Sequence, residues 1–141
     1  MMFSKSFIID AVPVAKGRPK FAKRGKFVST YTPKKTVDYE SIVKQSAHDA
    51  MGYQDPLETP IRLLVTFVMP IPASYSKKAK EACLNGSTSH TKTPDIDNLL
   101  KSLTDAMNGI VYVDDSQITS IQAMKTYGAH TCTKVFIRED I

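Results

Sequence analysis

A nearly continuous run of apolar and β-branched residues, IRLLVTFVMPIP at positions 61–72, is the strongest structural signal in the sequence. Such a run predicts a central strand covered on both faces, which Pro70 and Pro72 would end. Shorter apolar segments predict further strands or extended pieces at 3–12, 28–31, 110–113, 117–128 and 133–139.

Three other segments predict helices, and in the first and third of them apolar residues recur at intervals of three and four. The first runs from an expected N-cap at Thr36 to Gly52, and the second is SKKAKEACL, with Ser76 as its N-cap. The third begins near Asp97 and ends at Gly109. Its apolar stripe consists of Leu99, Leu100, Leu103, Ala106, Met107 and Ile110.

The expected order of elements is strand, helix, strand, two helices and then strands. This order favours an α+β fold in which helices pack against one mixed sheet of about four to six strands. No internal repeat or domain boundary interrupts the 141 residues, so we expect a single domain over 1–141. No apolar run approaches the ~18 residues of a transmembrane helix, and a secretory signal is not expected, so we expect no membrane partner. Two cysteines without CxxC spacing suit a reducing cytoplasm.

The net charge of +5 comes with an uneven distribution of basic residues. The span from Ala11 to Thr36 contains no acidic residue, and three aromatic residues lie among its charges. Such a segment can hold phosphates and stack on bases, although it is equally compatible with a solvated, flexible loop. Its basic residues are Lys16, Arg18, Lys20, Lys23, Arg24, Lys26, Lys34 and Lys35.

Acidic residues are also clustered, since five of the 14 lie between Asp95 and Asp115. Asp95 and Asp97 flank the start of the third predicted helix, and Asp114 and Asp115 follow its end. A helix of about eleven residues is ~16 Å long, and a returning strand of roughly four residues recovers ~13 Å, so the second pair can return beside the first.

Each acidic pair alone is more often a helix cap or a turn than a catalytic group. Converging carboxylates repel one another, however, and this repulsion requires a proton or a cation. Mg²⁺ prefers oxygen ligands, and it can generate a hydroxide nucleophile and stabilise phosphoryl charge. Lys101 lies four residues after Asp97, on the same helical face, and could stabilise charge on a phosphate.

Other chemistries find less support in the sequence. The two cysteines have no CxxC spacing, which argues against a zinc site or a disulfide framework. The three histidines are scattered without HExxH spacing, and KGRPK lacks the pattern of a phosphate-binding P-loop.

The segment PDIDNLLKSLTDAMNGIVYVDDSQI resembles the signature of the RusA family of crossover-junction endodeoxyribonucleases, the Holliday junction resolvases of bacteria and their phages. That signature has an acidic-x-acidic-Asn entry, a helix with a lysine and a downstream Asp-Asp pair. The segments PVAKGRPKF and YTPKKTVDYE also match the family's N-terminal pattern.

The resemblance implies that Asp95, Asp97 and Asp115 are the essential carboxylates and metal ligands, and that Lys101 is the important lysine. It also implies a requirement for Mg²⁺ or Mn²⁺ and a homodimer with one mixed sheet per subunit. Asn98 and Asp114 occupy adjoining positions of the motif. The strands near the two termini, FSKSFIIDAV or TKVFIRED, could supply the dimer interface.

We therefore expect a metal-dependent, structure-selective endodeoxyribonuclease that resolves four-way junctions by paired symmetric nicks, in DNA recombination and repair. Two alternatives remain: a basic DNA-binding module without catalysis, and a small-molecule phosphohydrolase using the same carboxylates. The residues expected to hold the DNA backbone are Lys16, Arg18, Lys20, Lys34 and Lys35.

Overall fold

The computed structural model describes residues 2–17, 20–25 and 27–141. Its elements follow the predicted order, with one additional hairpin. They are β1 (Ser4–Ile9), β2 (Lys20–Arg24), β3 (Phe27–Tyr31), α1 (Lys34–Met51), β4 (Ile61–Met69), α2 (Lys77–Leu84), α3 (Ile96–Met107), the short 3-10 helix η1 (Asp115–Gln117), β5 (Ile118–Tyr127) and β6 (Cys132–Glu139).

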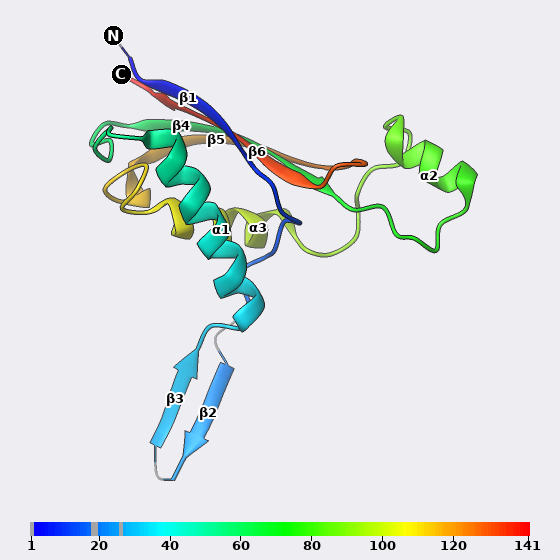
Figure 1. Ribbon diagram of the computed structural model, residues 1–141, viewed down its shortest axis with the longest axis horizontal. Helices are drawn as coiled ribbons and strands as arrows, with labels where there is room; N and C mark the ends of the chain where they lie inside the picture. The colour runs from blue at the N-terminus through cyan, green and yellow to red at the C-terminus, as the bar shows by residue number, and fades with distance from the viewer. Residues whose placement is uncertain (1, 18–19, 26) are drawn as a thin grey trace.

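Four strands form one mixed sheet in the order β1-β6-β4-β5. β4 pairs in parallel with β5, whereas its pairing with β6 and the pairing of β6 with β1 are antiparallel. The expected α+β fold with a single mixed sheet is thus confirmed. The pairing of β1 with β6 also brings the two ends of the chain side by side (Figure 1).

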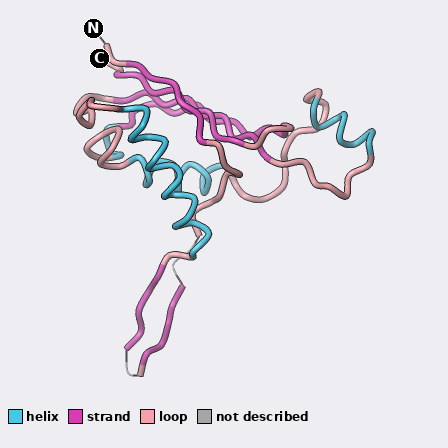
Figure 2. The backbone as a smooth tube through the Cα atoms, viewed as in Figure 1, coloured by secondary structure: helices cyan, strands magenta, loops and turns pink. Residues whose placement is uncertain are grey.

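β2 and β3 form a separate two-stranded antiparallel hairpin. Figures 1 and 2 show that this hairpin extends away from the sheet and the helices. The extended piece expected at 28–31 is its second strand. Its first strand, KFAKR, lies in the basic segment, where three basic residues in five positions gave no clear strand signal.

The hydrophobic core lies between one face of the sheet and the helices α1 and α3 (Figure 1). Alternate residues of β4 are buried against these helices, as period-two alternation requires. The core residues from the helices are Tyr39, Val43, Ala47 and Met51 of α1, and Leu99, Leu103, Ala106 and Met107 of α3.

β4 is central in the sheet, as expected, but the prediction that it is covered on both faces was wrong. Arg62 is exposed, and Leu64 keeps 36% of its surface in contact with solvent. The physical reason is visible in Figure 1, where α1 and α3 lie on the same side of the sheet and α2 lies beyond its end. In the sequence, the polar residues Arg62 and Thr66 within this run already indicated that one face of the strand is open to solvent.

The segment 110–113 does not join the sheet as the sequence predicted. Val111 and Tyr112 are buried, and Tyr112 forms only isolated bridges, to Leu57 and Asn108. Gly109 adopts a positive φ of 81°, which turns the chain back over the end of α3. The hydroxyl of Tyr112 then donates to the carbonyl oxygen of Thr104 at 2.6 Å, so this segment packs on the helix.

The expected N-cap at Thr36 was also wrong, because the N-cap is Pro33, three residues earlier, and α1 begins at Lys34. Thr36 is buried inside the first turn. Its hydroxyl accepts a hydrogen bond from the amide of Gly17 at 3.1 Å and donates to the carbonyl of Ala15 at 3.3 Å. The side chain thus joins the start of α1 to the loop before the hairpin.

None of the helices in the described part of the chain combines the length and the hydrophobicity that a membrane-spanning segment requires.

Candidate active site

The helix α3 presents one polar face that carries several of the candidate residues. Its apolar stripe is buried in the core, which turns Asp97, Lys101 and Asp105, spaced four residues apart, away from the sheet. Asp95 is the N-cap residue of this helix and makes no side-chain capping hydrogen bond. Both Asp95 and Asp97 are exposed, so their carboxylate oxygens are accessible at the positively polarised end of the helix.

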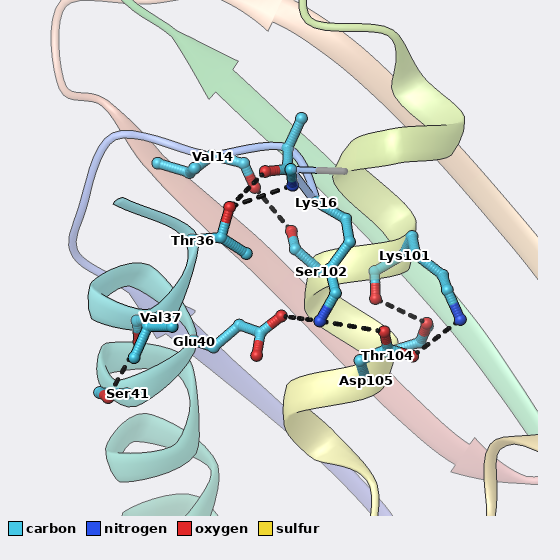
Figure 3. A network of polar contacts seen from close by, with 12 residues as sticks. Val14, Lys16, Thr36, Val37, Glu40, Ser41, Lys101, Ser102, Thr104 and Asp105 are labelled. Atoms are coloured by element: carbon cyan, nitrogen blue, oxygen red, sulfur yellow. Dashed lines mark hydrogen bonds and ion pairs between the residues drawn. The ribbon is translucent and has the colours of Figure 1, made fainter. Parts of the chain in front are cut away.

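A network of ions spans the second half of α3 and connects it to two other segments (Figure 3). The Asp105 carboxylate receives Lys101 Nζ at 3.2 Å on one oxygen and Lys16 Nζ at 3.4 Å on the other. Lys16 also contacts Glu40 of α1 at 2.7 Å. Lys101 is 60% exposed, whereas the side chains of Lys16, Asp105 and Glu40 retain only 27, 24 and 15% of their surface. Lys101 is the accessible cation of this network.

The electrostatics of Lys16 follow from these partners. Burial acts to lower the pKa of its ammonium group, but the hydrogen bond and charge of Glu40, assisted by Asp105, outweigh burial and raise the pKa above its usual value. Lys16 therefore stays protonated and is neutralised by carboxylates of its own chain.

The loop at 12–17, which leads into the basic hairpin, is fastened directly to α3. The backbone amide of Lys16 donates to the carbonyl of Asn98 at 2.9 Å. The hydroxyl of Ser102 donates to the carbonyl of Val14 at 2.6 Å (Figure 3). The start of the acid-free basic segment, up to Gly17, is therefore held in a fixed relation to the acidic helix.

The other basic candidates lie around this junction. Lys34 pairs with Asp38 at 2.9 Å, and both side chains are exposed. Lys35 is exposed beside a hollow of about 770 Å³ that also borders Lys92 and Pro94, close to the start of α3. Lys20 begins β2, and Arg18 lies outside the described residues.

The two residues of the Asp-Asp pair differ in their hydrogen bonds, because the side chain of Asp114 caps a helix. Asp114 caps η1: its carboxylate accepts the amide hydrogen of Ser116 at 3.2 Å, and its own amide donates to the side chain of Gln117 at 2.9 Å. The bonds from Ser116 hold the pKa of Asp114 below its usual range. Asp115 is the first residue of η1 and is half-buried.

The pKa of Tyr112 responds to burial and to several nearby carboxylates. Burial first, and then the negative charges of Asp115, Asp105 and Asp114, raise the pKa of its phenol far above its usual value. The hydroxyl of Tyr112 is bonded to the carbonyl of Thr104. The charge of Asp115 thus acts on a buried phenol that is bonded to α3. Asp97 is ~12 Å before Asp105 along the helix axis.

The three predicted metal ligands, Asp95, Asp97 and Asp115, do not surround one common position in the structure. Within the described ranges 2–17, 20–25 and 27–141, no group of three or more His, Cys, Asp and Glu side chains is placed to hold a metal ion. The donor chemistry nevertheless fits a hard divalent ion, because Mg²⁺ is usually held by one or two carboxylates, with water and substrate phosphate completing its shell. Asp95 and Asp97 offer such oxygens without a capping bond that would have to be broken.

Two residues of this network were missed by the sequence reasoning. Asp105 could have been found, because it follows Lys101 by four residues on a predicted helix. Glu40 gave no comparable signal, since its contact with Lys16 joins residues 24 positions apart.

Comparison with known proteins gives two matches that cover nearly the whole chain. The sequence model of the family described as Endodeoxyribonuclease RusA matches residues 10–138. The chain is also 33% identical over 135 residues to "Uncharacterized protein YqaN" of Bacillus subtilis (strain 168), and the aligned region covers 94% of each chain.

Proposed function

Because the chain belongs to the RusA endodeoxyribonuclease family, we propose that it is a metal-dependent nuclease that resolves four-way DNA junctions by paired symmetric nicks. Residues 1–141 would act as one nuclease domain, in the cytoplasm of a bacterium or of a phage-infected cell, in recombination and repair. The observation that carries the proposal is the exposed pair Asp95 and Asp97, on the same helix as the accessible Lys101.

Asp95, Asp97 and Asp115 would hold Mg²⁺ or Mn²⁺. Such an ion, when bound, supplies an activated water and stabilises charge on the phosphoryl oxygens. Asp95 is the N-cap residue of α3 and Asp97 lies in its first turn, so one backbone element orients both carboxylates. Asp115 enters from η1, which Gln117 fixes through hydrogen bonds to the carbonyls of Leu57 and Thr59 at 2.8 and 3.0 Å.

Lys101 would stabilise the negative charge that develops on the phosphate or on the leaving oxygen. Its partner Asp105 also carries a bond to Lys16, so the carboxylate can release Lys101 to a phosphate without itself losing every cation. This arrangement places an available ammonium group one turn after Asp97 on the same helical face.

The DNA backbone would be held by Lys16, Arg18, Lys20, Lys34 and Lys35. Support comes from the continuity of this segment with the site, because the loop at 12–17 is bonded to Asn98 and Ser102 of α3. A homodimer would supply two equivalent sites, as two symmetric nicks require.

The decisive experiment compares nicking of a synthetic four-way junction with nicking of a linear duplex, with and without Mg²⁺. We expect junction-selective nicking that needs the ion. Asp95→Asn and Asp97→Asn should abolish cleavage while junction binding persists. Asp55→Asn, at an exposed loop position, is the matched control and should cleave as the unmodified protein does.

The same assay separates the alternatives. Junction binding without cleavage at any divalent ion concentration would identify a DNA-binding module. Hydrolysis of nucleotides without a preference for branched DNA would identify a small-molecule phosphohydrolase.

A further inference from the structure

Lys125 on β5 reaches the segment that leads into the proposed active site. Its Nζ donates to the carbonyl oxygen of Lys92 at 2.8 Å and to that of Pro94 at 2.9 Å. Pro94 immediately precedes Asp95, the N-cap residue of α3. One ammonium group therefore bridges two carbonyls within three residues of a carboxylate that we assign to metal binding.

These bonds act on a segment with little regular structure of its own. Residues 89–95 are all described and form neither helix nor strand. Pro94 has no amide hydrogen to donate, so the position of this backbone depends on what its carbonyls accept. Hydrogen bonds from a charged donor are roughly twice as strong as neutral ones. Here one ammonium group makes two of them, to two carbonyls of the same segment.

A second contact from the same strand holds the other end of the segment. The ring centroids of Tyr127 and His90 are 4.7 Å apart. Lys125 and Tyr127 are two residues apart on β5, so their side chains leave the same face of the sheet. The strand thereby contacts the segment at His90, at Lys92 and at Pro94.

β5 itself is fixed by its parallel pairing with the central strand β4. Lys125 is paired with Phe67, and Tyr127 with Met69, and both of these β4 residues are buried in the sheet. The backbone of Asp95 is thus held from two sides: by α3, where its carbonyl accepts the amide hydrogen of Leu99 at 3.1 Å, and by the sheet through Lys125.

We propose that Lys125 is a positioning residue for the Asp95 carboxylate, acting through the carbonyls of Lys92 and Pro94. The inference rests on the proposed function. Lys125 contacts backbone and would not touch the phosphate. Its removal should let the segment before α3 shift, and displacements of about 1 Å at a catalytic group can reduce a rate roughly 100-fold.

The test uses Lys125→Met, which keeps the unbranched side chain to within one atom of its length and removes its donors. We expect a 10- to 100-fold lower single-turnover nicking rate on saturating four-way junction, and a higher Mg²⁺ concentration for half-maximal rate. Junction affinity measured without metal should not change. Lys125→Arg, which retains charged donors, should recover part of the rate. Lys44→Met, at an exposed position of α1, is the control for loss of a positive charge.

Equal nicking rates and equal Mg²⁺ dependence in Lys125→Met and the unmodified protein would overturn the inference. If Lys125→Met does not fold, Lys125→Gln, which keeps one neutral donor, carries the same measurement and the same criterion. Asp95→Asn distinguishes the two proposals. Cleavage lost in Asp95→Asn but normal in the Lys125 variants rejects only the role of Lys125, whereas cleavage retained in Asp95→Asn rejects the proposed function itself.

Discussion

The ammonium group of Lys101 lies 3.2 Å from the carboxylate of Asp105, one turn further along the same helix. An exposed ion pair of this spacing contributes only about 0.3–0.5 kcal/mol, so a phosphate can displace the carboxylate at little cost. Asp105 keeps its second partner, Lys16, when this happens. The pair thus keeps the Lys101 ammonium group close to the proposed metal ligands while leaving it available to a phosphate.

Lys101→Met should lower the nicking rate at saturating junction by roughly 10²–10³, the usual cost of removing one donor that stabilises transition-state charge. Junction affinity should fall little, because a single phosphate contact among many is lost. Rates from single-turnover assays and affinities from mobility shifts check both statements. Lys78→Met, an exposed residue of α2, is the control. A parallel loss of affinity and rate would instead assign Lys101 to DNA binding.

Lys16→Met should destabilise the fold, because Glu40 and Asp105 would face each other without their shared cation. We expect the free energy of unfolding in urea to fall by roughly 1–2 kcal/mol, between the values for exposed and buried pairs. Glu40→Gln removes one of the opposing charges. The double variant should therefore lose less than the sum of the two single changes, and strict additivity would show that the Lys16–Glu40 contact contributes nothing.

Because Glu40 and Asp105 neutralise Lys16, we expect Lys16 to contribute less to DNA binding than Lys35 does. Lys35 is exposed, whereas Lys16 is already paired with two carboxylates. A lysine that contacts a phosphate contributes about one unit to the slope of log affinity against log salt. We expect Lys35→Met to reduce this slope and Lys16→Met to reduce it less, as measured by junction binding between low and moderate salt. The reverse order would mean that DNA draws Lys16 away from Glu40.

A buried bond between Tyr39 of α1 and Thr133 of β6 joins the helix layer to the sheet, with the two oxygens 2.9 Å apart. Burial raises the pKa of Tyr39, so its phenol stays neutral and able to donate. Tyr39→Phe should lower the free energy of unfolding by about 1–3 kcal/mol, because Thr133 is left without its partner. Thr133→Val added to Tyr39→Phe should restore part of this loss in urea denaturation. No recovery would indicate that packing and not the bond is disturbed.

His90 should make stability sensitive to acid. Burial, and next the charge of Lys125, lower the pKa of His90 below its ordinary value of 6.5. The unfolded chain therefore binds a proton at this residue before the folded chain does, and stability falls as the pH drops below 6.5. The drop in Tm between pH 7.5 and 5.5 should be smaller in His90→Asn. Lys125→Met, which removes the second cause, should reduce the drop in part, and an unchanged drop in both variants would contradict the assignment.

The sequence predicted the sheet where local preference and burial agree. The run at 61–69 became the central strand because its alternate residues fill the core. The run at 110–113 has similar residue types but buries Val111 and Tyr112 against the end of α3. Strand propensity cannot distinguish these cases, since both satisfy burial and only the turn at Gly109 decides between them.

The candidate site was likewise predicted only as far as local sequence patterns reach. The exposure of Asp95 and Asp97 at a helix start follows from spacing and from the buried stripe of α3. The contacts that surround them are long-range: Lys125 to Pro94, and Lys16 to Glu40, join residues 31 and 24 positions apart. Such contacts depend on how the sheet and helices meet, which no local pattern specifies.

The adjacency of β1 and β6 has a practical consequence for engineering the chain. Ser4 is paired with Arg138, so a few added residues would suffice to join the two ends covalently. New ends could then be opened at the turn that follows α2, where Gly86 is exposed. Figure 1 shows α2 well apart from α3. A circular permutant of this kind should retain the sheet order. Purification tags at the original ends would lie at one corner of the molecule, opposite the projecting hairpin.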